Sequence, residues 1–528
     1  MGTLATLLHN IAVFISQFQI SAEDIQLWVA LLTAGILAIT LGAGRLARWI
    51  KRPSPALKTL GTAAAILLAV LVAYTYFYYS RTPGSWIHRW DIFHSSMNSR
   101  YFKELGYFEL YECTLTLGSS SISSLDGVER IRDLNTLDYV DAETVIQTSD
   151  CAARFSEQRR SEFIRDLEFW DELMPGRWQA LLQDKGYNGT PFYTFLYQRL
   201  IGRQPFEVSQ ITALALVDVF MLAIAFAGVL RAYGPRVALF SFLFFGVNFP
   251  NRFVHMGGAI LRFDYIVLLI LAICALKLKK PGLSGALIAL SSMSRVFPFL
   301  FAVGFGIKAA VGWFKTRKIS SDTVWFFAWF AATLLIAFLV SLSIGGIEAW
   351  TQFLANSIEH NQNTAGFRIG FRHLFMVGGN LFGPEGFTYF EEKTQIFNSH
   401  LVSYFLAITL MVIALAWIGD RIDAVNFTIL FGVLSFYLLF ASTRYYYSIL
   451  VLLFLFVTDK RFWTNRKNTW LWLFLFLVSA ATFIAWQFNN FEPFIYNTFI
   501  SALLGIGSIL IIAVLHLSLP DRFPHEQK

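Results

Sequence analysis

The chain has 528 residues, of which 56% are hydrophobic and 15% are charged, and its formal net charge is +7. Its mean hydropathy of +0.54 indicates more apolar surface than a single soluble core could bury, which excludes an ordinary soluble protein. No arm rich in Lys and Arg alternates with exposed aromatic residues, so the positive charge does not indicate a nucleic-acid partner. The composition predicts an all-α, polytopic membrane protein surrounded by lipids.

The N-terminal part, 1–79, begins with a weakly apolar stretch at 4–18, which favours an interfacial helix over a membrane span. Apolar runs at about 27–48 and 59–79 predict the first two spans. The first residues lack a basic region followed by an apolar core and a cleavage site with small residues. No removable signal peptide is therefore predicted.

A long polar segment, 80–210, follows the second span and predicts a large external loop. Cys113 and Cys151 both lie in this segment, where they could form a disulfide in an oxidising compartment or remain two thiols. Apolar residues recur at helical spacing within 155–173. This pattern predicts an amphipathic helix that could lie on the membrane face.

The rest of the chain contains two membrane parts, 211–343 and 401–528, separated by a second external loop at 344–400. An arginine and a proline interrupt the apolar stretch 283–312, which predicts two shorter helices there. The other predicted spans are 211–230, 237–250, 262–277, 323–343, 401–418, 425–441, 445–457, 469–486 and 495–516. Together these segments predict about 11 to 13 transmembrane helices.

The distribution of basic residues predicts the orientation of the spans. Lys and Arg concentrate in alternate short loops, beginning with 45–53, and are sparse in the short loops between them. By the positive-inside rule, the loops rich in Lys and Arg are cytoplasmic. The two large loops, 80–210 and 344–400, are therefore expected on the external face.

Ionisable residues occur at five places that this topology brings to the external face, where we expect them to converge. They are His88, Asp91, His94, Asp184, Arg252, His255, Arg262, Asp264, His360, Arg368, Arg372, His373 and Arg444. Arg295 is a further candidate, because a charge within an apolar stretch is costly unless it is paired or hydrated. Asp218, inside a predicted span, could pair with Arg295 or could only hydrogen-bond a neighbouring helix.

These residue types indicate a phosphate ester at the end of a lipid chain as the substrate. Arginine grips phosphate oxygens with two hydrogen bonds, a carboxylate can take a proton from an attacking hydroxyl, and aromatic rings suit sugars and isoprenoid tails. The histidines lack metal-ligand spacing and no Gly-rich phosphate loop is present, so no metal or other cofactor is predicted. Each of these residues could instead have a purely structural role, for example in a helix cap, in a turn or as an arginine that reaches the membrane interface.

Three features resemble the GT-C superfamily of integral membrane glycosyltransferases. An acid, Asp91, follows a span early in the first external loop; an Asn-Phe-Pro-Asn-Arg turn occupies 248–252; and a Gly-rich run, 282–298, contains Arg295 shortly before its final proline. The chain is most similar to the mannosyltransferase-like branch that uses polyprenyl-phosphate sugars. The resemblance covers roughly 59–460 in architecture.

This resemblance implies a hexosyltransferase that moves a sugar from a polyprenyl-phosphate donor to a hydroxyl of a lipid or glycan acceptor, with inversion. Asp91 would take the position of the family's catalytic base. Arg295 would occupy the position of the basic residue that precedes the proline in the family. Several members have an adjacent acidic pair where this chain has one acid, so Asp184 could supply a second carboxylate. The implied location is a bacterial inner membrane in the cell envelope, with the active site facing the periplasm.

Two other functions share part of this pattern. A transporter or lipid flippase would also have many spans, but it is expected to show paired interrupted helices in two repeated halves, and one interrupted region is evident. A glycan ligase or polymerase that uses a lipid-diphosphate donor would share the chemistry. Its large external loop is expected late in the chain, whereas here the largest loop comes early.

Overall fold

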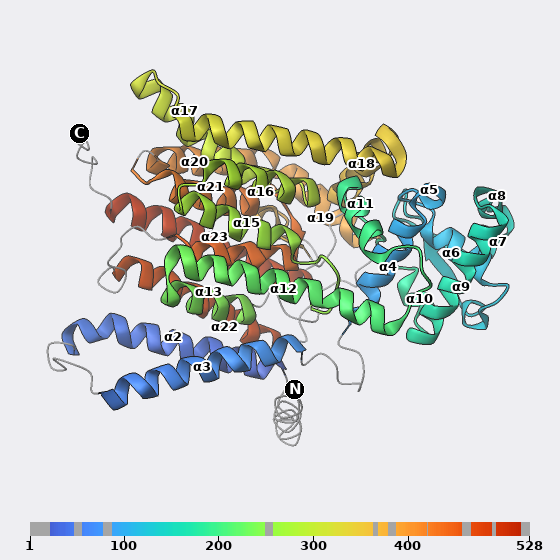
Figure 1. Cartoon of the computed structure of the whole chain (residues 1–528), viewed down its shortest axis with the longest axis horizontal. Coiled ribbons are helices and arrows are strands. Elements are labelled where there is room, and N and C mark those ends of the chain that lie inside the picture. Colours follow the sequence, from blue (N-terminus) through green and yellow to red (C-terminus); the bar gives the residue numbers. More distant parts are fainter. Residues whose placement is uncertain are drawn as a thin grey trace.

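In a computed structural model, the protein consists almost entirely of helices (Figure 1). The described residues are 22–46, 55–77, 87–248, 257–362, 368–378, 387–419, 421–456, 466–487 and 493–518. Among them, six helices are long and apolar enough to cross a membrane. Length and composition therefore indicate an integral membrane protein with several spans, as predicted. The expected interfacial helix at 4–18 lies outside the described residues.

Long helices form a bundle that includes the six candidate spans, and large apolar side chains remain exposed on its outside. Phe220, Ile336 and Val402, for example, are 68%, 62% and 83% exposed, which suits contact with lipid rather than water. The helices of the bundle are α2 (Ala22–Leu46), α3 (Pro55–Phe77), α12 (Val208–Tyr233), α13 (Pro235–Val247), α15 (Asp264–Lys277), α16 (Pro281–Ser294), α17 (Phe299–Thr316), α18 (Ser321–Gln362), α20 (Leu401–Gly419), α21 (Ala424–Leu439), η4 (Arg444–Phe454), α22 (Arg466–Gln487) and α23 (Pro493–Ser518).

Each predicted span coincides in large part with one of these helices, although the span predicted at 445–457 is the 3-10 helix η4. The predicted interruption is also present. Helix α16 ends at Ser294, Arg295 has an extended backbone, and α17 begins at Phe299 directly after Pro298. Pro298 has no N–H to donate to the Ser294 carbonyl, and its ring would clash with that carbonyl in a continuous helix, which explains why α16 stops here.

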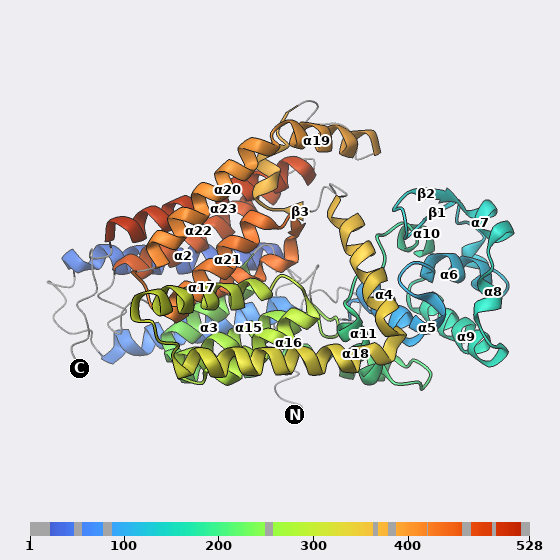
Figure 2. The ribbon, with the colours of Figure 1, turned by 90° about the horizontal axis from the view of Figure 1, so that it is seen from above.

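Helix α18 extends much further than the predicted span 323–343, because it continues through a kink at Gly345 and Gly346. Gly346 has φ 65° and ψ −155°, a conformation that is accessible essentially to glycine alone. The part before the kink packs on α16, and α11 (Pro191–Ile201) packs with residues on both sides of the kink. Beyond the kink the helix leaves the bundle (Figure 2), and its Phe353 ring lies 6.1 Å from the ring of Tyr107. The first third of the predicted second external loop, 344–400, is therefore helical.

The predicted loop 80–210 is largely a folded unit, which we call the head domain (87–206). Its elements are α4 (Arg89–Arg100), α5 (Phe102–Leu105), α6 (Leu110–Gly118), η1 (Ser123–Leu125), β1 (Arg130–Arg132), β2 (Tyr139–Asp141), α7 (Ala142–Thr148), α8 (Cys151–Arg154), α9 (Glu157–Leu173), α10 (Trp178–Leu181) and α11. Strands β1 and β2 pair antiparallel, with Arg130 opposite Asp141. Figure 1 shows the head domain at one end of the bundle.

The head domain has an apolar core separate from the main core of the bundle, and residues of α12, α18 and the turn before α15 complete it. Phe163, Leu167 and Trp170 of α9 are buried in this core. The helix predicted at 155–173 is thus confirmed, but the expectation that it lies on the membrane face is wrong. Cys113 and Cys151 form a disulfide that joins α6 to α8, which selects the first of the two alternatives left open by the sequence.

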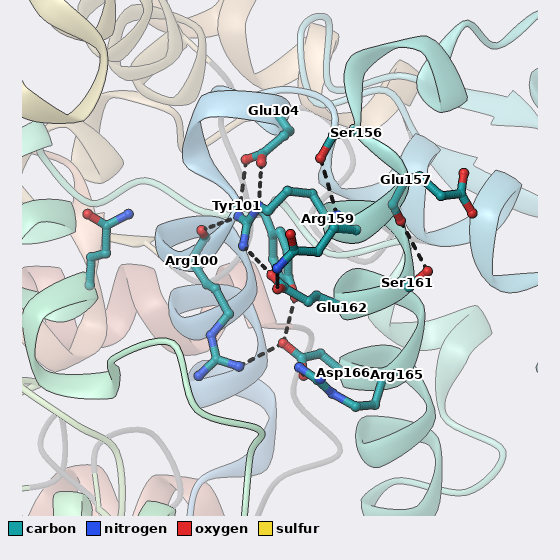
Figure 3. A network of polar contacts seen from close by, with 12 residues as sticks. Arg100, Tyr101, Glu104, Ser156, Glu157, Arg159, Ser161, Glu162, Arg165 and Asp166 are labelled. Atoms are coloured by element: carbon teal, nitrogen blue, oxygen red, sulfur yellow. Dashed lines mark hydrogen bonds and ion pairs between the residues drawn. The ribbon is translucent and has the colours of Figure 1, made fainter.

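A buried polar network fixes α4 against α9 (Figure 3). Arg100 at the end of α4 forms an ion pair of 2.7 Å with Asp166, and the Tyr101 hydroxyl donates to the same carboxylate oxygen at 2.7 Å. Arg159 of α9 pairs with Glu104 at 2.7 Å. Burial and the charge of Asp166 raise the pKa of Tyr101 well above its ordinary value, so Tyr101 remains a donor. This network orients the helix that carries Asp91.

Candidate functional site

The first turn of α4 carries Asp91, which forms an ion pair with Arg262 from a turn of the bundle. Asp91 Oδ1 and Arg262 Nη1 are 2.6 Å apart. The His88 side chain caps the helix by accepting the Asp91 N–H at 3.2 Å. The two paired side chains are 13% and 16% exposed, so neither is fully enclosed. The structure thus brings together two predicted site residues that lie far apart in the sequence.

The second carboxylate oxygen of this pair, Asp91 Oδ2, is buried and has no hydrogen-bond partner within the part of the chain that the structure describes. Such an acceptor is costly to bury unless a ligand or water completes it. Burial alone would lower the pKa of Arg262, but the negative charge of Asp91, together with Tyr445 and Tyr446, raises this pKa above its ordinary value. The Arg262 guanidinium also lies 4.0 Å from the centre of the Tyr445 ring. Arg262 is therefore a permanent cation beside a carboxylate with one open oxygen.

A second acid and base pair lies in the same region. Asp264, the first residue of α15, accepts the Tyr265 N–H at 2.7 Å and the Ser294 hydroxyl. Arg295 Nη1 lies 3.3 Å from the same Ser294 hydroxyl oxygen, and its guanidinium lies 4.2 Å from the centre of the Tyr193 ring. Ser294 therefore links the two charges, which also attract each other.

Asp218 of α12 is fully buried, and its Oδ2 accepts the backbone N–H of Arg262 at 2.9 Å. The hypothesis that Asp218 pairs with the Arg295 side chain is therefore not the arrangement found, because Asp264 is the carboxylate linked to Arg295. Asp264 was predicted at the external face and Asp218 inside a span, but the sequence indicated neither the link from Asp264 to Arg295 nor the contact of Asp218 with the Arg262 backbone.

Two other predicted residues hold the head domain together. Asp184 accepts the Trp90 indole N–H at 2.6 Å and the Lys185 N–H at 2.8 Å. His94 is buried, with its ring nitrogens 2.8 Å from the Trp90 carbonyl oxygen and 2.6 Å from the Tyr111 hydroxyl. These contacts give both side chains a structural role, and a part in chemistry remains a prediction.

The remaining basic candidates form a group that we call the basic cluster: Arg368, Arg372, His373 and Arg444. Strand β3 (Arg368–Ile369) pairs antiparallel with β4 (Ser442–Thr443), which sets Arg368 opposite Thr443 and beside Arg444. Arg372 and His373 follow on η3 (Phe371–Phe375). The cluster adjoins the first site, because Tyr445, whose ring lies under Arg262, directly follows Arg444.

Positive charge accumulates in the basic cluster. Burial and the neighbouring charge of Arg372 lower the pKa of Arg368 to about 10. Burial and both arginines lower the pKa of His373 to about 3, so this histidine is neutral. Arg444 is buried, with its guanidinium 5.8 Å from the centres of the Trp486 and Tyr496 rings. A negatively charged group would be favoured here.

His360, near the end of α18, joins the two parts of the protein. Its ring nitrogens lie 2.9 Å from the Asn356 carbonyl oxygen and 3.0 Å from the Lys185 carbonyl oxygen, and its own carbonyl accepts a hydrogen bond from Arg368. It therefore connects the basic cluster to the head domain. Two further candidates, Arg252 and His255, lie outside the described residues. Within the described residues, no group of three or more His, Cys, Asp or Glu side chains could hold a metal ion.

Comparison with known proteins gives no match: no protein family, no curated protein and no solved structure is similar to this chain.

Proposed function

We propose that this protein is a membrane glycosyltransferase similar to the GT-C superfamily. It transfers a sugar from a polyprenyl-phosphate donor to an acceptor hydroxyl, with inversion at the sugar. The observation that carries the proposal is the pairing of Asp91 with Arg262, which leaves the buried Asp91 Oδ2 open as an acceptor beside the basic cluster. A hydroxyl group is a neutral donor of suitable size for that oxygen.

Asp91 acts as the general base in this scheme. Its Oδ2 takes the proton of the acceptor hydroxyl while the hydroxyl oxygen attacks the anomeric carbon of the sugar. The new carbon–oxygen bond forms as the bond from the anomeric carbon to the phosphate oxygen breaks, and the phosphate leaves with the electron pair. Arg262 holds Oδ1 at 2.6 Å and so aims Oδ2. Only the acceptor oxygen that lies opposite the leaving phosphate reacts, which gives inversion.

The leaving phosphate is assigned to the basic cluster rather than to Arg262 or Arg295. Both of these arginines already face a carboxylate, Asp91 or Asp264, which offsets their charge. In contrast, Arg368 is buried beside Arg372, and burial together with the positive charge of Arg372 lowers the pKa of Arg368. A phosphate would relieve this repulsion, and its charge increases as the sugar bond breaks, so the interaction strengthens in the transition state.

The lipid part of the donor fits the architecture. The site lies where the head domain meets a bundle whose outside is apolar, so a polyprenyl tail can stay in lipid while its phosphate reaches the arginines. We further propose about 11 to 13 spans, with the head domain on the external face by the positive-inside rule. In a bacterium this places the site in the inner membrane, facing the periplasm.

The proposal is tested by assaying the purified protein in lipid nanodiscs with a panel of radiolabelled polyprenyl-phosphate hexoses. Membrane glycolipid and glycan extracts serve as acceptors. We expect at least one donor to transfer its sugar to an extract component. The Asp91→Asn variant should lose transfer, whereas Glu157→Gln, on the head surface, should retain it. Absence of transfer from every donor, or full transfer by Asp91→Asn, would overturn the proposal.

A further inference from the structure

The turn 257–263, which carries Arg262, has an unfavourable backbone conformation. Leu261, directly before Arg262, has φ 55°, a left-handed conformation that side chains other than glycine rarely adopt. Such a conformation persists where the surrounding structure imposes it. The strained residue therefore raises the question of what holds the turn.

Three elements outside the turn hold its backbone. The His88 N–H donates to the Gly258 carbonyl at 2.8 Å, and the Tyr193 hydroxyl donates to the Ile260 carbonyl at 3.1 Å. Asp218 Oδ2 accepts the Arg262 N–H at 2.9 Å. The first two contacts come from the head domain, whereas Asp218 comes from the bundle helix α12. Of these three contacts, the one from Asp218 is made to the backbone of Arg262 itself.

The position of Asp218 is costly for a carboxylate. The buried stripe of α12 consists of Ile211, Ala215, Asp218, Leu222, Ala225 and Val229, so Asp218 is the one ionisable side chain in this stripe. An acid in a membrane helix is destabilising unless its oxygens are satisfied, and Asp218 Oδ1 is buried without a hydrogen-bond partner among the described residues, which leaves the bond from Oδ2 to the Arg262 N–H. An apolar residue here would pack well in the stripe but would leave the Arg262 N–H without this acceptor. The burial and the hydrogen bond together argue that Asp218 does more than fill space.

We propose that Asp218 is a positioning residue for the Asp91–Arg262 pair. Its hydrogen bond to the Arg262 backbone fixes the strained turn so that the guanidinium meets Asp91 Oδ1 and leaves Oδ2 open. Asp218 touches neither substrate nor the reacting atoms, and it acts through Arg262. The catalytic consequence rests on the proposed function, but the effect on the ion pair does not depend on it.

The ion pair is tested first, in full-length protein in nanodiscs, without any substrate. A double-mutant cycle combines Asp91→Asn and Arg262→Gln and measures the melting temperature. With Asp218 present, the melting temperature of the double variant should fall by less than the sum of the decreases in the two single variants, because both changes break the same ion pair. In the Asp218→Ser background the losses should become additive, because the short side chain cannot hold the turn. Asp218→Asn keeps an acceptor oxygen and should restore the coupling.

A matched control is Ser241→Ala, which removes a buried hydroxyl whose hydrogen bonds among the described residues stay within its own helix, to the Val237 and Ala238 carbonyls. It should leave the coupling unchanged. If Asp218→Ser does not fold, Asp218→Glu replaces it in the cycle, because the longer side chain displaces the carboxylate and should also weaken the coupling. Full coupling in the Ser or Glu background would show that Asp218 only stabilises the fold, and would overturn the inference.

Sugar transfer provides the second measurement. Asp218→Ser should lower kcat by between about tenfold and a hundredfold, with the donor KM nearly unchanged, because a misplaced pair affects the reaction more than binding. Asp218→Asn should recover most of this loss. A changed KM at normal kcat would contradict a positioning role. If the unaltered protein transfers no sugar, the proposed function fails, whereas the double-mutant cycle still decides the inference about Asp218.

Discussion

Replacing Asp166 by Asn should destabilise the head domain by about 3 to 5 kcal/mol, the usual cost of breaking a buried ion pair from one side. The Arg100 and Asp166 side chains are 3% and 1% exposed, so water cannot take over the lost interactions. One carboxylate oxygen accepts both the Arg100 guanidinium and the Tyr101 hydroxyl at 2.7 Å. Asn removes the negative charge, and its NH2 group, a hydrogen-bond donor, can face the Arg100 and Tyr101 donors. Arg100 is then left as a buried cation beside Phe206.

The melting temperature of the purified full-length protein measures this effect, and a loss of that size should lower it by roughly 10 °C or more. Glu157→Gln on the same helix is the matched control. Its partner Arg160 and Glu157 itself are 39% and 78% exposed, so this pair should contribute no more than about 1 kcal/mol. Equal shifts for the two variants would refute the argument that burial determines the cost.

Three further predictions concern stability. The pKa of His373 is lowered to about 3 from an ordinary 6.5. As the pH falls, the unfolded chain therefore binds a proton before the folded protein does, and the free energy of unfolding decreases between about pH 6.5 and pH 3. His373→Gln should reduce this pH dependence in melting temperatures recorded across that range. Removing the disulfide with Cys113→Ser and Cys151→Ser should cost about 4 kcal/mol for a separation of 38 residues, seen in denaturant unfolding as a lower midpoint. Gly346→Ala should lower the melting temperature by the equivalent of about 1 to 3 kcal/mol, whereas Gly35→Ala, which has open space within a helix, should not lower it.

The sequence predicted the bundle well because membrane helices are defined by local composition. A run of apolar residues long enough to cross a bilayer can satisfy its backbone only as a helix, and the break between α16 and α17 follows from one proline. The limit of α18 was missed because its second part, after Gly346, is no longer uniformly apolar and packs on the head domain instead of lying in lipid.

The head domain and the site depend on contacts between distant residues, which a single sequence does not specify. The convergence of Asp91 and Arg262 at one membrane face was expected from topology, and the structure adds their direct ion pair. The pairing of Arg295 with Asp264 through Ser294, rather than with Asp218, depends on how three helices pack. The left-handed Leu261 had no signal in the sequence, because leucine carries no preference for that conformation.

The most direct test of the central claim is a comparison of donor kinetics for two variants in nanodiscs. Asp91→Asn should lower kcat by about a hundredfold or more at an unchanged donor KM, because it removes the base but leaves the phosphate contacts. Arg368→Gln should instead raise the donor KM, since Arg368 contributes to the positive surroundings of the phosphate. A normal kcat for Asp91→Asn would contradict the account.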